Sequence, residues 1–158
     1  MPSQREAYAM TRYLLITDFQ PGVAGTPIED WKPEEVEAHL NYYRLLHREL
    51  IASGELVQSE VLAGPDLGKV VTSDGSATHV LDGPFGEFKE WIAGYQIVDV
   101  DSEERAIEIA ARLSAVPGPG GRPIQQPIQV RRIMDDGPST AVEMDDWLET
   151  AGGGARKA

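Results

Sequence analysis

The sequence contains no cysteine and few basic residues. The first absence excludes disulfide bonds, thiolate metal ligands and cysteine nucleophiles, and it is typical of a reducing compartment. The second leaves a net charge of −12 at pH 7, which opposes binding to nucleic acid or to an anionic membrane. The longest apolar runs, such as Tyr13–Ile16, are far shorter than the roughly 20 residues of a membrane-spanning helix. We therefore expect a cytoplasmic protein that contacts neither membranes nor nucleic acid.

The 158 residues, 41% of them apolar and 25% charged, are typical of one globular domain. The first ten residues lack both periodicity and the apolar stretch of a secretory signal. We divide the chain into a flexible N-terminal extension (1–10), a folded domain (11–134) and an acidic, glycine-rich C-terminal tail (135–158). Within that tail we expect one short helical turn around Met144–Leu148, through which Trp147 and Leu148 would dock onto the domain.

The order of the elements expected from the sequence indicates the fold class. Pro33 suits the first position of a helix and Gly54 its end, which predicts a helix between them. The complete order is strand, helix, strands, strand, helix, strand. Two such β-α-β units pack as an α+β, ferredoxin-like β-α-β-β-α-β sandwich with both helices on one face of the sheet. The opposite face needs a cover, so we expect a homodimer. The ranges predicted as strands are 12–17, 55–62, 69–72, 78–81, 93–100 and 128–134, and the second helix is predicted from 103 to about 115.

The first helix carries His39, Tyr43 and His47 at positions i, i+4 and i+8 of its apolar face. The outer pair is about 12 Å apart along the axis, which is too far for both imidazoles to bind one small ion. One histidine, together with the Tyr43 hydroxyl, would line a polar hole against the sheet and carry out acid–base chemistry. The alternative is a structural histidine satisfied at the edge of the helix.

No motif indicates a metal or a cofactor. The glycine-rich stretch Pro117–Pro123 follows a helix and precedes a strand, the reverse of a phosphate-binding loop. The sequence has neither a Gly-x-Ser-x-Gly nor a Ser-x-x-Lys motif for a serine nucleophile. We therefore expect no metal, no cofactor and no hydrolase of these types.

The most distinctive local string is Asp82-Gly83-Pro84-Phe85, which enforces a turn. Together with its continuation to Tyr95, the segment Ile97–Ala106 and the string Gln129–Arg131, it resembles the YCII-related family, specifically the branch named after the DGPF string. The resemblance extends over residues 11–134. It implies a dimeric α/β-barrel of ferredoxin-like subunits.

The resemblance also implies candidate functions. Some YCII-type members are similar to small-molecule enzymes in which a helix histidine pairs with an aspartate, one of them a dehydrochlorinase. Aligning Gly54 with the glycine that ends that helix places the catalytic-histidine position at Tyr43. Gln129 stands where a glutamate is usual and Arg132 where proline is common, whereas Arg131 is retained. DGPF-type proteins are often similar to gene neighbours of extracytoplasmic-function sigma factors, which implies an indirect link to transcriptional regulation.

Three functions remain open from the sequence. The first is a dimeric binding or regulatory module that accepts a small polar or aromatic molecule in a cleft lined by Tyr43, His47, Asp82 and Arg131. The second is an enzyme of proton transfer or elimination, with His47 or His39 as base and Asp82 orienting or protonating. The third is a structural adaptor that holds a protein partner through the C-terminal tail.

Overall fold

The computed structural model describes residues 10–18, 22, 24–83, 91–134 and 137–150. The expected flexible extension lies almost entirely outside this part of the chain. The second half of the Asp82–Phe85 string also lies outside the described residues.

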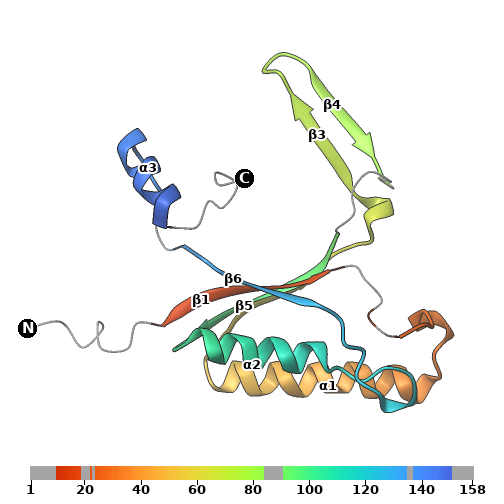
Figure 1. Ribbon diagram of the computed structural model, residues 1–158. Coiled ribbons are helices and arrows are strands. Elements are labelled where there is room, and N and C mark those ends of the chain that lie inside the picture. The colour runs from red at the N-terminus through yellow and green to blue at the C-terminus, as the bar shows by residue number, and fades with distance from the viewer. Residues whose placement is uncertain (1–9, 19–21, 23, 84–90, 135–136, 151–158) are drawn as a thin grey trace, which may run out of the picture.

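One four-stranded antiparallel sheet forms the centre of the molecule (Figure 1). Its strands lie in the order β2-β5-β1-β6. The two central strands pair from Thr11 opposite Val100 to Thr17 opposite Gly94, and the register shifts before Asp18. This is the strand order of a ferredoxin-like sandwich, so the predicted fold class is confirmed. The strands are β1 (Thr11–Asp18), β2 (Leu56–Val61), β5 (Ile92–Val100) and β6 (Ile128–Arg132).

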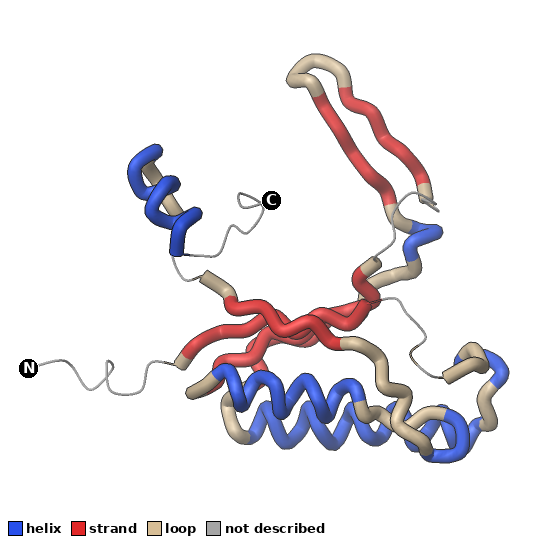
Figure 2. Tube along the Cα trace, viewed as in Figure 1, coloured by secondary structure: helices blue, strands red, loops and turns tan. Residues whose placement is uncertain are grey.

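Two helices, α1 (Pro33–Ala52) and α2 (Glu103–Ser114), lie side by side on one face of this sheet (Figures 1 and 2). Both begin where the sequence supplies a cap. At the start of α1 the Glu35 carboxylate accepts a hydrogen bond from the Lys32 backbone N–H at 3.0 Å, and at the start of α2 the Ser102 hydroxyl accepts one from the backbone N–H of Arg105 at 3.2 Å. Such caps satisfy N–H groups that have no partner within the helix. In the described part of the chain, no helix is long and apolar enough to span a bilayer.

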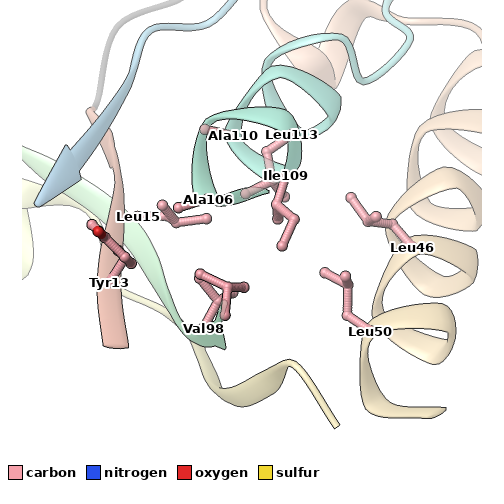
Figure 3. Close-up of a cluster of buried hydrophobic side chains, with 10 residues drawn as sticks. Tyr13, Leu15, Leu46, Leu50, Val98, Ala106, Ile109, Ala110 and Leu113 are labelled. Atoms are coloured by element: carbon pink, nitrogen blue, oxygen red, sulfur yellow. The ribbon is translucent and has the colours of Figure 1, made fainter. Parts of the chain in front are cut away.

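The hydrophobic core lies between the helices and the sheet (Figure 3). Alternate residues of the central strands, such as Leu15 and Val98, face Leu46 and Leu50 of α1 and Ile109 of α2. Because successive strand residues point to opposite faces, their chain neighbours lie on the face that carries no helix. Truncating one of these buried leucines to alanine typically costs about 2–5 kcal/mol.

Two ion pairs hold α2 against α1 and against the connection from α1 to β2. The Arg105 guanidinium binds both oxygens of the Glu55 carboxylate, at 2.8 and 2.9 Å. Arg112 binds both oxygens of Glu49 in the same manner, at 2.7 Å for each contact. The helix positions that line the site described below are therefore supported both by the core and by these paired charges.

Several elements extend the six-element sandwich. Strands β3 (Lys69–Ser73) and β4 (Thr78–Asp82) form a separate two-stranded hairpin between β2 and β5, which projects from the side of the sheet opposite the helices (Figure 1). Helix α3 (Ala141–Thr150) follows β6 and stands clear of the sheet. Three short 3-10 helices complete the described elements: η1 (Ile28–Asp30), η2 (Pro65–Leu67) and η3 (Pro119–Gly121).

The tail differs from its sequence prediction, because α3 is a ten-residue helix rather than a single turn. Its start is a capping box. The Thr140 hydroxyl accepts a hydrogen bond from the Glu143 N–H at 3.2 Å, and the Glu143 carboxylate accepts one from the Thr140 N–H, also at 3.2 Å. These reciprocal bonds stabilise a first turn and allow the helix to continue.

Candidate functional site

A series of rings follows the edge of α1 that faces the sheet. The centroids of His39 and Tyr43 lie 5.2 Å apart, and those of Tyr43 and His47 lie 6.1 Å apart. Trp31, which precedes the helix, meets His39 edge-on at 5.3 Å. The i, i+4 spacing places the three helix rings one above another, as the sequence predicted.

These rings form one wall of a cleft of about 380 Å³ between α1 and the sheet. A volume of this size suits a small organic molecule. Its mouth includes Leu40, and the neighbouring strands supply its floor. The floor and far side consist of Thr17, Ser59, Glu60, Val61, Ala93, Gly94, Gln96 and Gln126.

Gly94 allows two strands to approach closely at the floor of the cleft. A Cβ atom at this position would lie 2.7 Å from the Glu60 carbonyl oxygen, which is closer than real Cβ atoms come. The residue at 94 must therefore be glycine if β2 and β5 are to keep this separation.

The two histidines of the cleft differ in their hydrogen bonds. His39 donates from Nδ1 to the Pro117 carbonyl oxygen at 2.9 Å. His47 Nε2 is buried and has no hydrogen-bond partner. The structural interpretation offered for a histidine on this helix therefore fits His39, whereas His47 retains a free ring nitrogen.

A second buried polar atom without a partner lies in the same cleft. The Gln96 side chain donates from Nε2 to the Ser59 hydroxyl at 3.4 Å, and its Oε1 has no donor. A buried polar group left unpaired is unfavourable. Two of the four buried side-chain atoms without a partner in the described residues, His47 Nε2 and Gln96 Oε1, therefore belong to residues of this one cleft.

The described side chains that face the cleft are uncharged at neutral pH. Burial lowers the pKa of His47 below its ordinary value of 6.5, which favours the neutral ring at pH 7. Burial also raises the pKa of the Tyr43 hydroxyl, with a smaller contribution from Tyr42, so that Tyr43 stays protonated. The Glu60 carboxylate accepts a hydrogen bond from Gln58 at 3.4 Å, and both of these side chains lie on the opposite face of β2. As far as the described residues form it, the cleft is therefore an uncharged, largely apolar site with a few polar atoms.

The structure brings together only some of the residues predicted for the site. Tyr43, His47 and His39 all line the cleft. Asp82 lies at the end of β4 and forms an exposed ion pair with Lys69, and it is not part of the cleft wall. Arg131 is exposed on β6, where it stands opposite Leu14 and so points to the face of the sheet away from α1. Neither residue reaches the histidines within one copy of the chain.

Among the cleft residues missed from the sequence are Gln96 and Ser59. In β5 the alternation places Gln96 on the same face as the buried Val98 and Val100, so a polar side chain occupies a core-facing position. Ser59, its partner on β2, occupies a similar inward position. A polar residue that interrupts a buried alternating pattern is the feature that would have indicated both.

A second hollow and the acidic and histidine side chains of the described residues give weaker indications of a binding site. A hollow of about 570 Å³ lies between the loop at Ala24–Thr26 and the segment from Pro119 to Gln125, and no orphaned buried polar atom lines it. In the described ranges no group of three or more His, Asp or Glu side chains is arranged to hold a metal ion. We therefore take the α1 cleft as the candidate site.

Comparison with known proteins identifies the family of the chain. A family model described as the YCII-related domain matches residues 11–118. An uncharacterized protein of Rhizobium meliloti (strain 1021) is 29% identical over 84 residues, which cover 53% of this chain and 68% of that protein. The range matched by the family model contains α1, β2 and β5, and thus nearly every wall of the cleft.

Proposed function

Because the chain belongs to the YCII-related family, we propose that it uses the cleft between α1 and the sheet to bind a small organic molecule. The observation that carries this proposal is the pair of orphaned buried atoms, His47 Nε2 and Gln96 Oε1, in one otherwise apolar cleft. A ligand that pairs with both atoms removes the penalty of leaving them unsatisfied. Within the family, the string that begins at Asp82 supports placement in the DGPF branch.

Binding can be tested with a library of small fragments followed by ligand-observed NMR. Leu40 and Leu45 are exposed to the same extent on α1, at 51% and 52%, but only Leu40 lines the cleft. We expect Leu40→Trp, which fills the mouth, to weaken fragment binding at least about tenfold, and Leu45→Trp to leave it unchanged. Equal binding by the two variants would place the fragments elsewhere on the protein.

A second candidate function is proton transfer or elimination on the bound molecule. The observation in its favour is that His47 has a free Nε2 and a pKa lowered by burial, so the ring is an unprotonated base at neutral pH. Asp82 takes no part in this version, because it pairs with Lys69 on the hairpin. Turnover of a bound fragment that survives in His47→Gln would eliminate His47 as the base.

We also propose that a second copy of the chain covers the face of the sheet opposite the helices. Strand alternation places the paired residues Leu14 and Ile97 on that face, and both helices of the sandwich lie on the other face. Self-association is the usual cover for a surface of this kind. A regulatory role linked to extracytoplasmic-function sigma factors, as the DGPF resemblance implies, would then depend on ligand binding to the dimer and on a protein partner.

A further inference from the structure

The chemistry around Gln96 narrows the class of ligand. Resting on the proposed function, we infer that Gln96 makes the cleft selective for an uncharged ring compound that carries a hydrogen-bond donor, such as a hydroxyl or an amide N–H. The donor group would pair with Gln96 Oε1 and the ring would lie against the side chains of α1.

The orientation of the Gln96 amide determines which partner it accepts. The side chain is only 7% exposed, and its nitrogen is used by the Ser59 hydroxyl. The oxygen that remains can only accept a hydrogen bond. His47 Nε2, by contrast, either donates or accepts according to its tautomer. Gln96 therefore requires the ligand to carry a hydrogen-bond donor.

The absence of charge in the cleft excludes ionised ligands. Among the residues that the structure describes, no lysine or arginine lines the cleft, and the one acidic residue that does, Glu60, directs its carboxylate to the opposite face, where Gln58 binds it. A carboxylate or phosphate placed here would lose its hydration without gaining a cation, and an ammonium group would gain no anion. The protein's net charge of −12 adds to the penalty for an anion.

The walls favour a ring. Tyr43 and the two histidines line the cleft with rings packed against one another, and Leu40 and Val61 border it with aliphatic carbon. Planar rings stack on such side chains in offset or edge-to-face geometry. The volume of about 380 Å³ accommodates one or two fused rings with their substituents.

Three matched probes test this selectivity: phenol, which has a donor, anisole, which has the same ring without a donor, and benzoate, which is charged. Dissociation constants are measured by NMR titration of the full chain. We expect phenol to bind at least about tenfold more tightly than anisole, and benzoate to bind more weakly than either.

A pair of glutamine variants identifies the residue responsible. Gln96→Leu removes the acceptor and should abolish the preference for phenol over anisole while anisole still binds. Gln58→Leu, on the other face of the neighbouring strand, should keep the preference. If Gln96→Leu does not fold, the comparison of the three probes on the unaltered protein still tests the preference for an uncharged ring that carries a donor.

The outcomes separate the two proposals. Equal binding of phenol and anisole to the unaltered protein, tighter binding of benzoate, or a preference that persists in Gln96→Leu would overturn the role of Gln96 and leave ligand binding intact. Failure of all three probes, together with failure of the fragment library, would instead reject ligand binding in the cleft.

Discussion

The Nδ1 atom of His39 donates a hydrogen bond to the carbonyl oxygen of Pro117, 78 positions away in the sequence. This bond joins the middle of α1 to the segment that follows α2. It gives His39 a structural task, whereas His47, two helical turns further along, keeps its Nε2 unpaired. The two histidines of one helix edge therefore differ in their partners: His39 is bonded to the backbone, and the Nε2 atom of His47 is left for the proposed ligand.

Replacing each histidine with phenylalanine should have opposite effects on stability. His39→Phe keeps a ring but leaves the Pro117 carbonyl without its donor, and we expect it to lower the free energy of unfolding by about 1 kcal/mol. His47→Phe removes an unpaired buried nitrogen, and we expect unchanged or higher stability together with altered ligand binding. Urea unfolding at pH 7.5 measures both variants. A larger loss for His47→Phe than for His39→Phe would contradict this assignment.

Stability should fall below pH 6.5 because of His47. Burial lowers its pKa in the folded protein below the ordinary 6.5 of the unfolded chain. Between these two pKa values the unfolded state therefore binds more protons than the folded state. The stability contributed by the neutral ring is fully present above pH 6.5. It is lost as the pH falls from 6.5 through the lower pKa of His47 in the folded protein. The urea midpoint should therefore decrease more between pH 7.5 and pH 5.5 in the unaltered protein than in His47→Phe. Parallel decreases in the two proteins would show that His47 does not contribute.

A methyl group at position 94 should damage the floor of the cleft. Its carbon would lie 2.7 Å from the Glu60 carbonyl oxygen, so Gly94→Ala must separate β2 from β5. We expect a loss of about 1–3 kcal/mol in the free energy of unfolding and weaker fragment binding. Gly25→Ala is the control, because no atom lies within 4 Å of a Cβ built there. Equal thermal midpoints for the two variants would show that the strands yield without cost.

A charge on the helix-free face of the sheet should disrupt the proposed dimer. Ile97→Glu places a carboxylate at the centre of that face, and we expect sedimentation velocity to report a monomer. Ile107→Glu makes the same chemical change on the exposed side of α2 and should leave a dimer. A monomer for the unaltered protein, or a dimer for Ile97→Glu, would reject this interface.

Removal of α3 should leave the sandwich intact. The helix stands clear of the sheet, so a chain truncated after Met134 should unfold within about 2 °C of the full chain. Fragment binding in the cleft should also be unaffected. A pull-down partner lost on truncation would support the adaptor function expected from Trp147 and Leu148. A large drop in the thermal midpoint would mean that α3 packs on the domain.

Local patterns in the sequence were sufficient for the fold. Pro33 and Gly54 mark α1 closely, and the order of strands and helices determines the ferredoxin-like sheet. The capping box of Thr140 and Glu143 was equally visible in the sequence, although the prediction of a single turn did not use it. These features depend on residues close together in the chain, which is why sequence reasoning reaches them.

The site was only partly predictable, because its decisive contacts join distant segments. The spacing of His39, Tyr43 and His47 correctly placed three rings on one edge of α1. Which histidine is satisfied depends on Pro117, a partner that helix periodicity does not reveal. The separation of Asp82 from the cleft depends on the direction of the hairpin, which neighbouring residues do not determine.

The hairpin formed by β3 and β4 also affects how the chain can tolerate changes in length. It lies within the connection between β2 and β5, two neighbouring strands that pair with each other. The entropy of closing such a connection grows only with the logarithm of its length, about 0.6 kcal/mol for each doubling. Insertions and deletions at the tip, around Asp74 and Gly75, should therefore accumulate in relatives without disturbing the sheet, so this loop is where homologues can diverge in size.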